Sequence, residues 1–258
     1  MAYDYEYFKK EVLSLTGIDL SCYKEKQMKR RIDTLISKHK IEGYDKYVSG
    51  LKKEPSLFDE FVNYITINVS EFYRNPEQWK LMDEQIIPEL IRRFGKSLKI
   101  WSAACSTGDE PYSLVMAFSK HLPMGNIRIH ATDLDKQVIE KAKAGLYSEK
   151  SIAAVPEEFK KKFFTKVGPS YKIADEIKGR VDFKEHNLLK DTYPTECHLI
   201  VCRNVLIYFT EEAKDEVFKK YYRSLTSGGV LFIGSTEQII NYKEIGYERK
   251  NSFFYQKP

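Results

Sequence analysis

The chain has 258 residues, of which 42% are hydrophobic, and its formal net charge is +5. This length predicts one main domain with a smaller partner, and so modest a charge argues against a nucleic-acid scaffold, where a basic stripe usually dominates. No apolar run approaches the roughly 20 residues of a membrane-spanning helix, and the first ten residues are aromatic and charged rather than a signal region. We therefore expect a cytoplasmic protein that neither enters the membrane nor binds nucleic acid.

The cysteines give no sign of a disulfide framework or a metal site. Cys22, Cys105, Cys197 and Cys202 form neither a CxxC pair nor a zinc-ligand spacing with histidines. Reduced thiols and no bound metal are expected, and a monomer is the default oligomeric state.

Residues 1–70 are predicted to form a small all-α N-terminal domain. Apolar residues recur there at helical spacing, and the breaks between the runs fall at Gly17, Gly43 and Pro55. The pattern predicts about four short helices. A further helix is expected from Pro76 through Leu90, so residues 71–97 form a linker and the first helix of the next domain.

Residues 98–258 are predicted to form a Rossmann-like α/β domain, because short apolar strands alternate there with helices. The expected strands cover residues 98–102, 127–132, 198–202, 229–233 and 253–256, and the expected helices cover 111–121, 136–144 and 211–225. Residues 148–187 are interpreted as an inserted β-subdomain with a helix at 157–163. Its strand candidates are 171–174 and 180–184.

A turn of small residues follows the first of these strands and ends at Gly108. It allows a ligand to approach the backbone, but it lacks the glycine spacing of dinucleotide-binding and phosphate-binding loops. Asp109 and Glu110 would repel a phosphate and favour a cationic ammonium group, such as that of S-adenosylmethionine. The alternative is an ordinary tight turn with a helix-capping acid.

Polar residues also follow the other strands. Asp133 ends the second strand, where Rossmann-like domains bind ribose hydroxyls, whereas Asp135 suits a helix cap. Asn187, Arg203 and Asn204 follow later strands and are candidates for contacts to adenine. A strand-ending aspartate taken alone is more often a turn residue.

The segment 65–76 links the two domains and contains Asn68, Ser70 and Arg74 among apolar anchors. This composition suits a lid over a cofactor. A plain interdomain linker is the alternative.

Four stretches together resemble the CheR family, the bacterial chemoreceptor glutamate methyltransferases. They read ITINVSEFYRNPEQW, IWSAACSTGDEPYSL, ATDLDKQVIEKAKAGLY and LIVCRNVLIYF. The resemblance covers nearly the whole chain and implies a class I methyltransferase domain with an inserted β-subdomain, preceded by a helical domain. It also implies that S-adenosylmethionine methylates the γ-carboxylate of receptor glutamates, giving methyl esters and S-adenosylhomocysteine.

The resemblance also implies which residues form the site. Arg74 and Tyr208 are the candidate catalytic residues. The implied cofactor-binding residues are Asn68, Ser70, Arg74, Glu110, Asp133, Asn187, Leu188, Arg203 and Asn204. In some family members the β-subdomain binds a receptor C-terminal peptide, whereas the tight turn at 167–170 argues against such tethering here.

A glutamate is ionised near neutral pH, so the expected reaction needs no general base and depends on orientation and desolvation. We expect Arg74 to bind the acceptor carboxylate or the cofactor and Tyr208 to orient the acceptor. Alternatively, Arg74 pairs with Glu71 or Asp109, and Tyr208 packs in the core.

A basic cluster is the candidate docking site for the acidic methylation helices of chemoreceptors, although such charge runs are often only solvated faces. The cluster consists of Lys24, Lys26, Lys29, Arg30 and Arg31. Other functions that the residues leave open are a methyltransferase for another acceptor and a non-enzymatic adaptor that binds the same cofactor.

Overall fold

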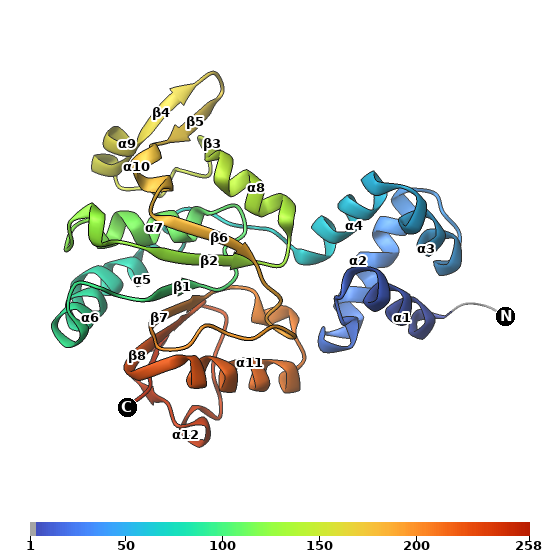
Figure 1. The fold of residues 1–258 in the computed structure, drawn as a ribbon. Helices are drawn as coiled ribbons and strands as arrows, with labels where there is room; N and C mark the ends of the chain where they lie inside the picture. The colour runs from blue at the N-terminus through green and yellow to red at the C-terminus, as the bar shows by residue number, and fades with distance from the viewer. Residues whose placement is uncertain (1–3) are drawn as a thin grey trace. The chain divides into compact units, whose positions relative to one another are not determined.

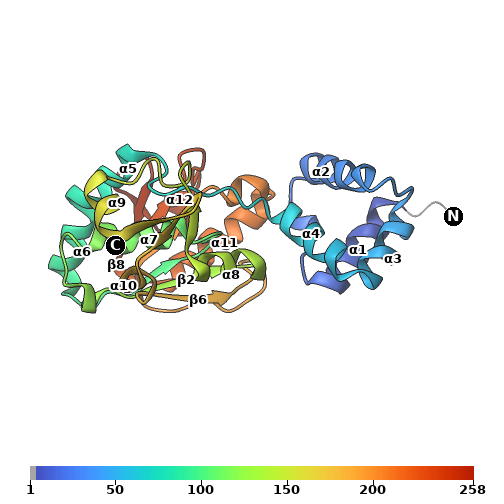
Figure 2. The same cartoon turned by 90° about the horizontal axis from the view of Figure 1, so that it is seen from above.

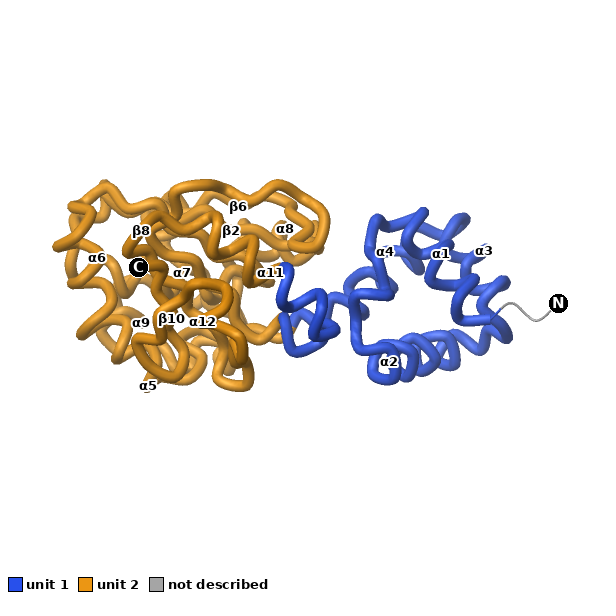
Figure 3. The backbone as a smooth tube through the Cα atoms, turned by 90° about the horizontal axis from the view of Figure 1, so that it is seen from below, with its two compact units in different colours: residues 1–68, 206–216 blue, residues 69–205, 217–258 orange. Residues whose placement is uncertain are grey.

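The computed structural model describes residues 4–258. It divides into two compact units, which are coloured separately in Figure 3. One unit holds the chain up to Asn68 together with Leu206–Glu216, and the other holds Val69–Val205 and Val217–Pro258. Each unit is described below by itself.

The first unit is a helical bundle, as the apolar periodicity predicts. Its helices are α1 (Tyr5–Thr16), α2 (Glu25–Lys38), α3 (Tyr44–Lys53) and α4 (Pro55–Thr66), with short 3₁₀ turns at Leu20–Cys22 and Leu206–Tyr208. Phe8, Tyr47 and Phe61 are fully buried and pack ring against ring, with 6.0 Å between the ring centroids of Phe8 and Phe61. Gly17 ends α1 with φ +71°, a conformation that glycine adopts without steric cost.

The second unit is built on a seven-stranded sheet in the order β6-β2-β1-β7-β8-β10-β9. The first five strands in this order run parallel, whereas β10 and β9 are antiparallel additions at one edge. The strand bounds are β1 Ile100–Ser102, β2 Ile129–Asp133, β6 Val181–Glu185, β7 Cys197–Cys202, β8 Leu225–Ile233, β9 Glu248–Arg249 and β10 Phe254–Gln256. This mostly parallel sheet confirms the Rossmann-like prediction.

Helices pack around this sheet (Figures 1 and 2). Their bounds are α5 Pro76–Leu81, α6 Ile87–Phe94, α7 Asp109–Phe118, α8 Lys136–Ala144, α11 Glu211–Ser224 and α12 Tyr242–Ile245. The helix expected at 76–90 is longer and is interrupted by a π-helical turn, Met82–Ile86. Pro88 lies just after this turn and has no backbone N–H, which explains why the regular α-helical bonding shifts there.

The β-subdomain contains three strands, of which the sequence-based interpretation expected only the one at 171–174. Its sheet has the order β3-β5-β4, with the bounds β3 Leu146–Ser148, β4 Phe164–Val167 and β5 Ser170–Ile173. Helix α9 covers Glu157–Phe163, as expected, and α10 covers Asp175–Lys178. The expected strand at 180–184 instead becomes β6, because Val181–Glu185 pairs in parallel with β2 in the main sheet.

Within residues 4–258, no helix combines the length and apolarity needed to cross a bilayer. The same residues contain no group of three or more His, Cys, Asp or Glu side chains arranged to hold a metal ion.

Candidate active site

The parallel strands bring together polar residues that are far apart in the sequence. Ser102 at the end of β1 is in register with Ala131 of β2 and Val201 of β7, and Cys202 of β7 is in register with Ile233 of β8. The carboxyl ends of these strands therefore share one edge of the sheet. This edge is where open α/β sheets bind ligands.

The turn between β1 and α7 is held close to its neighbours. Gly108 has φ +88°, and a Cβ atom built there would lie 2.8 Å from the Cβ of Ala142 and 3.1 Å from the Tyr147 hydroxyl oxygen. Any other residue would clash and be strained, so the glycine fixes the path of the turn. The helix begins at Asp109, two residues earlier than expected, with Glu110 and Pro111 also in its first turn.

Glu110 is a buried carboxylate held by side chains. The Ser102 hydroxyl donates to Glu110 Oε1 at 2.9 Å, and Arg203 Nη1 lies 3.8 Å from Glu110 Oε2. Burial raises the pKa of Glu110 to about 7, because the attraction of Arg203 offsets only part of the lost solvation. The group is therefore poised between its neutral and charged forms near neutral pH.

Asp133 is a second buried carboxylate, held by the backbone. Its two oxygens accept hydrogen bonds from the backbone N–H of Ser106 at 2.8 Å and of Asp135 at 3.0 Å. Burial raises the pKa of Asp133 to about 6, although these hydrogen bonds act in the opposite direction. Asp135 caps α8, as expected, by accepting from the Gln137 N–H at 2.8 Å.

Arg203 ties the start of α5 to the strand ends. One guanidinium nitrogen, Nη2, donates to the Arg74 carbonyl at 2.7 Å, to Gln78 Oε1 at 2.8 Å and to Asn75 Oδ1 at 3.1 Å. The guanidinium carbon also lies 4.7 Å from the centroid of the Phe232 ring. Gln78 and Asn75 are absent from the sequence-based set, because nothing local to them indicates a contact with a residue more than a hundred positions away.

The backbone around Arg74 is unusual. Tyr73 and Asn75, on either side of it, have φ +50° and +61°. The Arg74 carbonyl accepts from the Trp79 indole N–H at 3.0 Å as well as from Arg203, and the Arg74 guanidinium donates to the Val69 carbonyl at 3.3 Å. Within residues 4–258, Arg74 forms no ion pair with Glu71 or Asp109, the partners considered as an alternative.

The remaining sequence-predicted cofactor contacts lie in different places. Asn187 follows β6 and forms a turn, accepting from the Leu189 N–H at 2.9 Å, and Leu188 is buried beside it. Ser70 is half-buried in the segment before Arg74. Asn68 belongs to the first unit, where its amide donates to the Thr66 hydroxyl at 2.9 Å.

Tyr208 and the basic cluster also belong to the first unit. Tyr208 is half-buried, and its carbonyl accepts from the Lys24 N–H at 2.9 Å. Arg31 turns inward, because its guanidinium donates to the Tyr64 carbonyl at 2.6 Å. Lys29 lies 3.5 Å from Asp33, whereas Lys26 and Arg30 are exposed.

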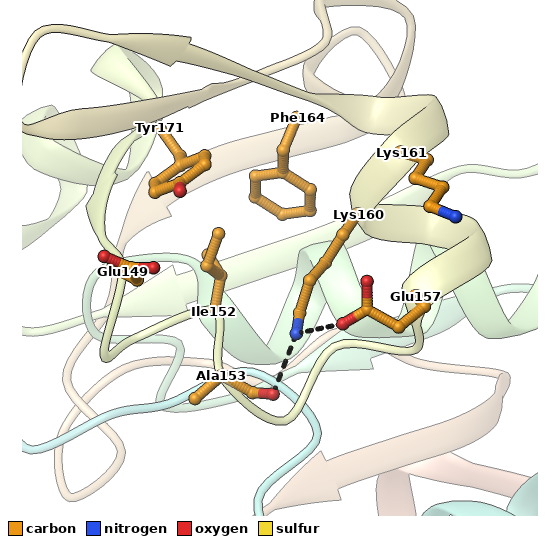
Figure 4. A pocket seen from close by; sticks show the side chains of 8 residues that line it. All are labelled: Glu149, Ile152, Ala153, Glu157, Lys160, Lys161, Phe164 and Tyr171. Atoms are coloured by element: carbon orange, nitrogen blue, oxygen red, sulfur yellow. Dashed lines mark hydrogen bonds and ion pairs between the residues drawn. The ribbon is translucent and has the colours of Figure 1, made fainter.

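A separate cavity of about 510 Å³ lies in the β-subdomain (Figure 4). The rings of Phe164 and Tyr171 and the side chain of Ile152 form one part of its wall. Lys160 reaches across to the Ala153 carbonyl at 3.1 Å and is paired with Glu157 at 2.7 Å. None of the sequence-predicted site residues lines this cavity.

The strand-end site fits a nucleoside that carries an ammonium group. Among residues 4–258, Ser106 Oγ and Asn204 Oδ1 are buried side-chain atoms for which no hydrogen-bond partner is present. One follows β1 and the other follows β7, at the edge that also holds Glu110 and Asp133. Unpaired buried polar groups are unfavourable unless a ligand pairs with them. S-adenosylmethionine offers hydroxyl, amine and ammonium groups to such partners.

Comparisons with known proteins identify the family. Residues 68–252 match the family model "CheR methyltransferase, SAM binding domain", and residues 3–66 match "CheR methyltransferase, all-alpha domain". A chemotaxis protein methyltransferase of Listeria innocua is 42% identical over 254 residues, which cover 98% of this chain and 97% of that protein. The chemotaxis protein methyltransferase Cher2 of Pseudomonas putida is 32% identical, with 92% of this chain and 90% of that protein covered.

Among solved structures, a TehB-like SAM-dependent methyltransferase from Corynebacterium glutamicum is similar at 17% identity and a TM-score of 0.39. The similarity covers 70% of this chain and 92% of that one, and it is too distant to bear on function. The two family models together match residues 3–66 and 68–252, and the Listeria relative spans nearly the whole chain. The chain therefore belongs to the CheR methyltransferase family and is an S-adenosylmethionine-dependent methyltransferase of chemotaxis.

Proposed function

We propose that this enzyme methylates the γ-carboxylate of specific glutamates in chemoreceptors, producing glutamate methyl esters and S-adenosylhomocysteine. The observation that carries the proposal is the pair of buried carboxylates, Glu110 and Asp133, at the edge where a phosphate-binding loop is absent. Curated relatives that span nearly the whole chain are named chemotaxis protein methyltransferases. Chemoreceptors are the acceptors that such a name implies.

The proposed donor contacts follow from charge and hydrogen-bonding capacity. The Glu110 carboxylate would hold the ammonium group, and Asp133 would accept from the ribose hydroxyls. Asn187 and Asn204 would bind the adenine, beside the buried side chain of Leu188. Arg203 would keep Glu110 in place, and Asn68, Ser70 and Arg74 would complete the donor site from the segment before α5.

When bound, S-adenosylmethionine supplies a sulfonium methyl group that a carboxylate oxygen can accept without any proton transfer. The residues of this chain therefore need only to position an ionised glutamate and exclude water from it. Arg74 is the proposed cationic partner of that glutamate or of the donor. Its charge already acts on Glu110 and Arg203, whose pKa values it lowers. Tyr208 is the proposed hydroxyl that orients the acceptor.

Receptor docking is proposed for the basic cluster on and before α2. Acidic methylation helices would be attracted by Lys24, Lys26, Lys29 and Arg30. Arg31 would add its positive charge, although its guanidinium is hydrogen-bonded to the Tyr64 carbonyl. Lys26→Gln combined with Arg30→Gln should flatten the salt dependence of methylation. An Arg31 variant is a poor test, since its loss would also remove a structural hydrogen bond.

The acceptor is tested by transfer of a radiolabelled methyl group to receptor-rich membranes. Label that alkali releases as methanol supports a carboxyl ester, whereas base-stable label would refute it. Protein without receptor membranes serves as the control for methylation of other acceptors.

The roles of Arg74 and Tyr208 are tested by kinetics on the same substrate. We expect Arg74→Ala to lower kcat/KM by about tenfold or more, and effects below about twofold would remove Arg74 from the mechanism. Tyr208→Phe should lower turnover and leave donor binding nearly unchanged. Lys166→Ala, an exposed change on β4, is a control that should leave both parameters unchanged.

A further inference from the structure

A buried carboxylate outside the sequence-predicted set joins the ends of two strands. Glu237 follows β8, and its Oε2 atom accepts from the Asn204 N–H at 2.9 Å and from the Gly234 N–H at 2.7 Å. Asn204 comes directly after the end of β7, one residue beyond Arg203. The Glu237 side chain is only 7% exposed, so both bonds form away from bulk water.

The backbone at both strand ends is shaped around this carboxylate. Asn204 has φ +60°, a left-handed conformation that asparagine adopts more readily than most other non-glycine residues, and here the bond to Glu237 holds its N–H. A Cβ atom on Gly234 would lie 2.7 Å from Glu237 Oε2 and 2.8 Å from the Asn204 nitrogen. Only glycine at position 234 therefore allows the carboxylate to reach both amides.

One polar atom of the Asn204 side chain, Oδ1, is not hydrogen-bonded within the described residues. Its Nδ2 atom lies 3.5 Å from the Thr236 hydroxyl, in the same segment as Glu237. Its Oδ1 atom is buried and has no hydrogen-bond partner within residues 4–258. A carbonyl oxygen in that state is suited to an N–H donor on a ligand.

We propose that Glu237 is a positioning residue for the methyl donor: it fixes Asn204 in the left-handed conformation that presents Oδ1 to an N–H group of the donor's nucleoside. This inference rests on the proposed function, because it assumes that Asn204 contacts the donor. In this role Glu237 acts on the donor only through Asn204. Its loss should therefore weaken binding of the donor and of its demethylated product equally, since both carry the same nucleoside.

The test compares three substitutions at Glu237 with a neighbouring control. Glu237→Ala removes the acceptor, Glu237→Asp keeps the charge but shortens the reach, and Glu237→Gln keeps an acceptor oxygen at the same distance. Gln238→Ala changes an exposed neighbour and serves as the control. Calorimetry measures the Kd of S-adenosylhomocysteine, kinetics separates KM from kcat, and NMR follows the backbone amides of Asn204 and Gly234.

We expect Glu237→Ala and Glu237→Asp to raise the Kd and the KM for the donor about tenfold, with kcat changed less than about threefold. Glu237→Gln should restore the Kd to within about threefold and return both amide resonances towards their wild-type positions. If Glu237→Ala does not fold, the contrast between the Asp and Gln variants carries the test. Wild-type Kd values in Glu237→Asp, or equal losses in the Asp and Gln variants, would overturn the inference.

One further variant separates this inference from the proposed donor site. If Asp133→Ala abolishes binding of S-adenosylhomocysteine while every Glu237 variant binds normally, only the positioning role of Glu237 is wrong. If Asp133→Ala also binds normally, the proposed donor site is wrong, and the inference falls with it.

Discussion

Glu110 and Asp133 lie at the ends of neighbouring elements and are both buried, yet they are held in different ways. Glu110 depends on two side chains, the Ser102 hydroxyl and the Arg203 guanidinium. Asp133 depends on backbone N–H groups in the β1–α7 turn and before α8. A carboxylate held by side chains can be detached by a single substitution. One held by the backbone changes only when its own side chain or the path of the chain changes.

The largest effect should come from breaking the side-chain arrangement at Arg203. Arg203→Met removes the partner of Glu110 and the donor to the Arg74 carbonyl, so we expect a loss of about 3–5 kcal/mol in the free energy of unfolding. Urea unfolding measures this loss. Arg203→Lys keeps the positive charge but not the planar, multiply donating guanidinium. Its free energy of unfolding should lie between those of Arg203→Met and wild type. A loss below about 1 kcal/mol for Arg203→Met would contradict the role of this network.

The second largest effect should be the change in the free energy of unfolding with pH. Because burial raises the pKa of Glu110 from 4.5 to about 7, the folded state binds the proton more tightly than the unfolded state. The resulting stabilisation is fully present below pH 4.5 and is lost as the pH rises through about 7, amounting to up to about 3 kcal/mol. Glu110→Gln lacks this contribution. Between pH 5 and pH 8, the free energy of unfolding measured in urea should therefore fall less for Glu110→Gln than for wild type. Equal decreases would be evidence against the raised pKa of Glu110.

A smaller loss should follow from Asp133→Ala, because it leaves the N–H groups of Ser106 and Asp135 without an acceptor. At pH 5, below the raised pKa of about 6, we expect a loss of about 2 kcal/mol in the free energy of unfolding. Asp133→Asn retains one acceptor oxygen and should lose about half as much. If the two variants are equally stable, the backbone bonds contribute little.

Ser102→Ala should have the smallest effect, a loss of about 1 kcal/mol, since one hydrogen bond to Glu110 is removed and Arg203 remains. That hydrogen bond lowers the pKa of Glu110, so its removal should move the midpoint of the pH-dependent transition upward. Unfolding measured across the same pH range detects this movement. A midpoint that moves downward would mean that the hydroxyl does not favour the charged form.

Elements with strong local signals could be predicted from the sequence. The bounds of α8 agree with the expected 136–144, because Asp135 caps its first turn and Gly145 ends it with φ +67°. The sequence pattern does not predict that β6 belongs to the main sheet, because Asp182 and Lys184 are exposed and give this strand the pattern of a polar hairpin strand. Strand β4 follows α9 without any turn residue, so periodicity alone does not separate them.

The residues of the candidate site likewise differ in whether the sequence predicts them. Glu110 and Asp133 could be predicted because an acid in the first turn of the helix after β1 and an acid at the end of β2 each have a recognisable place in an α/β fold. Gln78 and Glu237 could not, because their partners are fixed only when distant strands pair. The one local hint for Glu237 is the preceding Gly234, a glycine at the end of an apolar strand with an acid three residues later.

The left-handed residues on either side of Arg74 have a consequence for how the protein tolerates change. Each such residue other than glycine is disfavoured by about 1–3 kcal/mol. The Tyr73 N–H donates to the Ser113 hydroxyl, and the Arg74 carbonyl, between the two left-handed residues, accepts from Arg203 and Trp79. Damage to any of these anchors would let the chain relax into a commoner conformation and carry the Arg74 side chain away. A substitution of Ser113, which lies outside the proposed site, would therefore lower activity while leaving a well-folded protein.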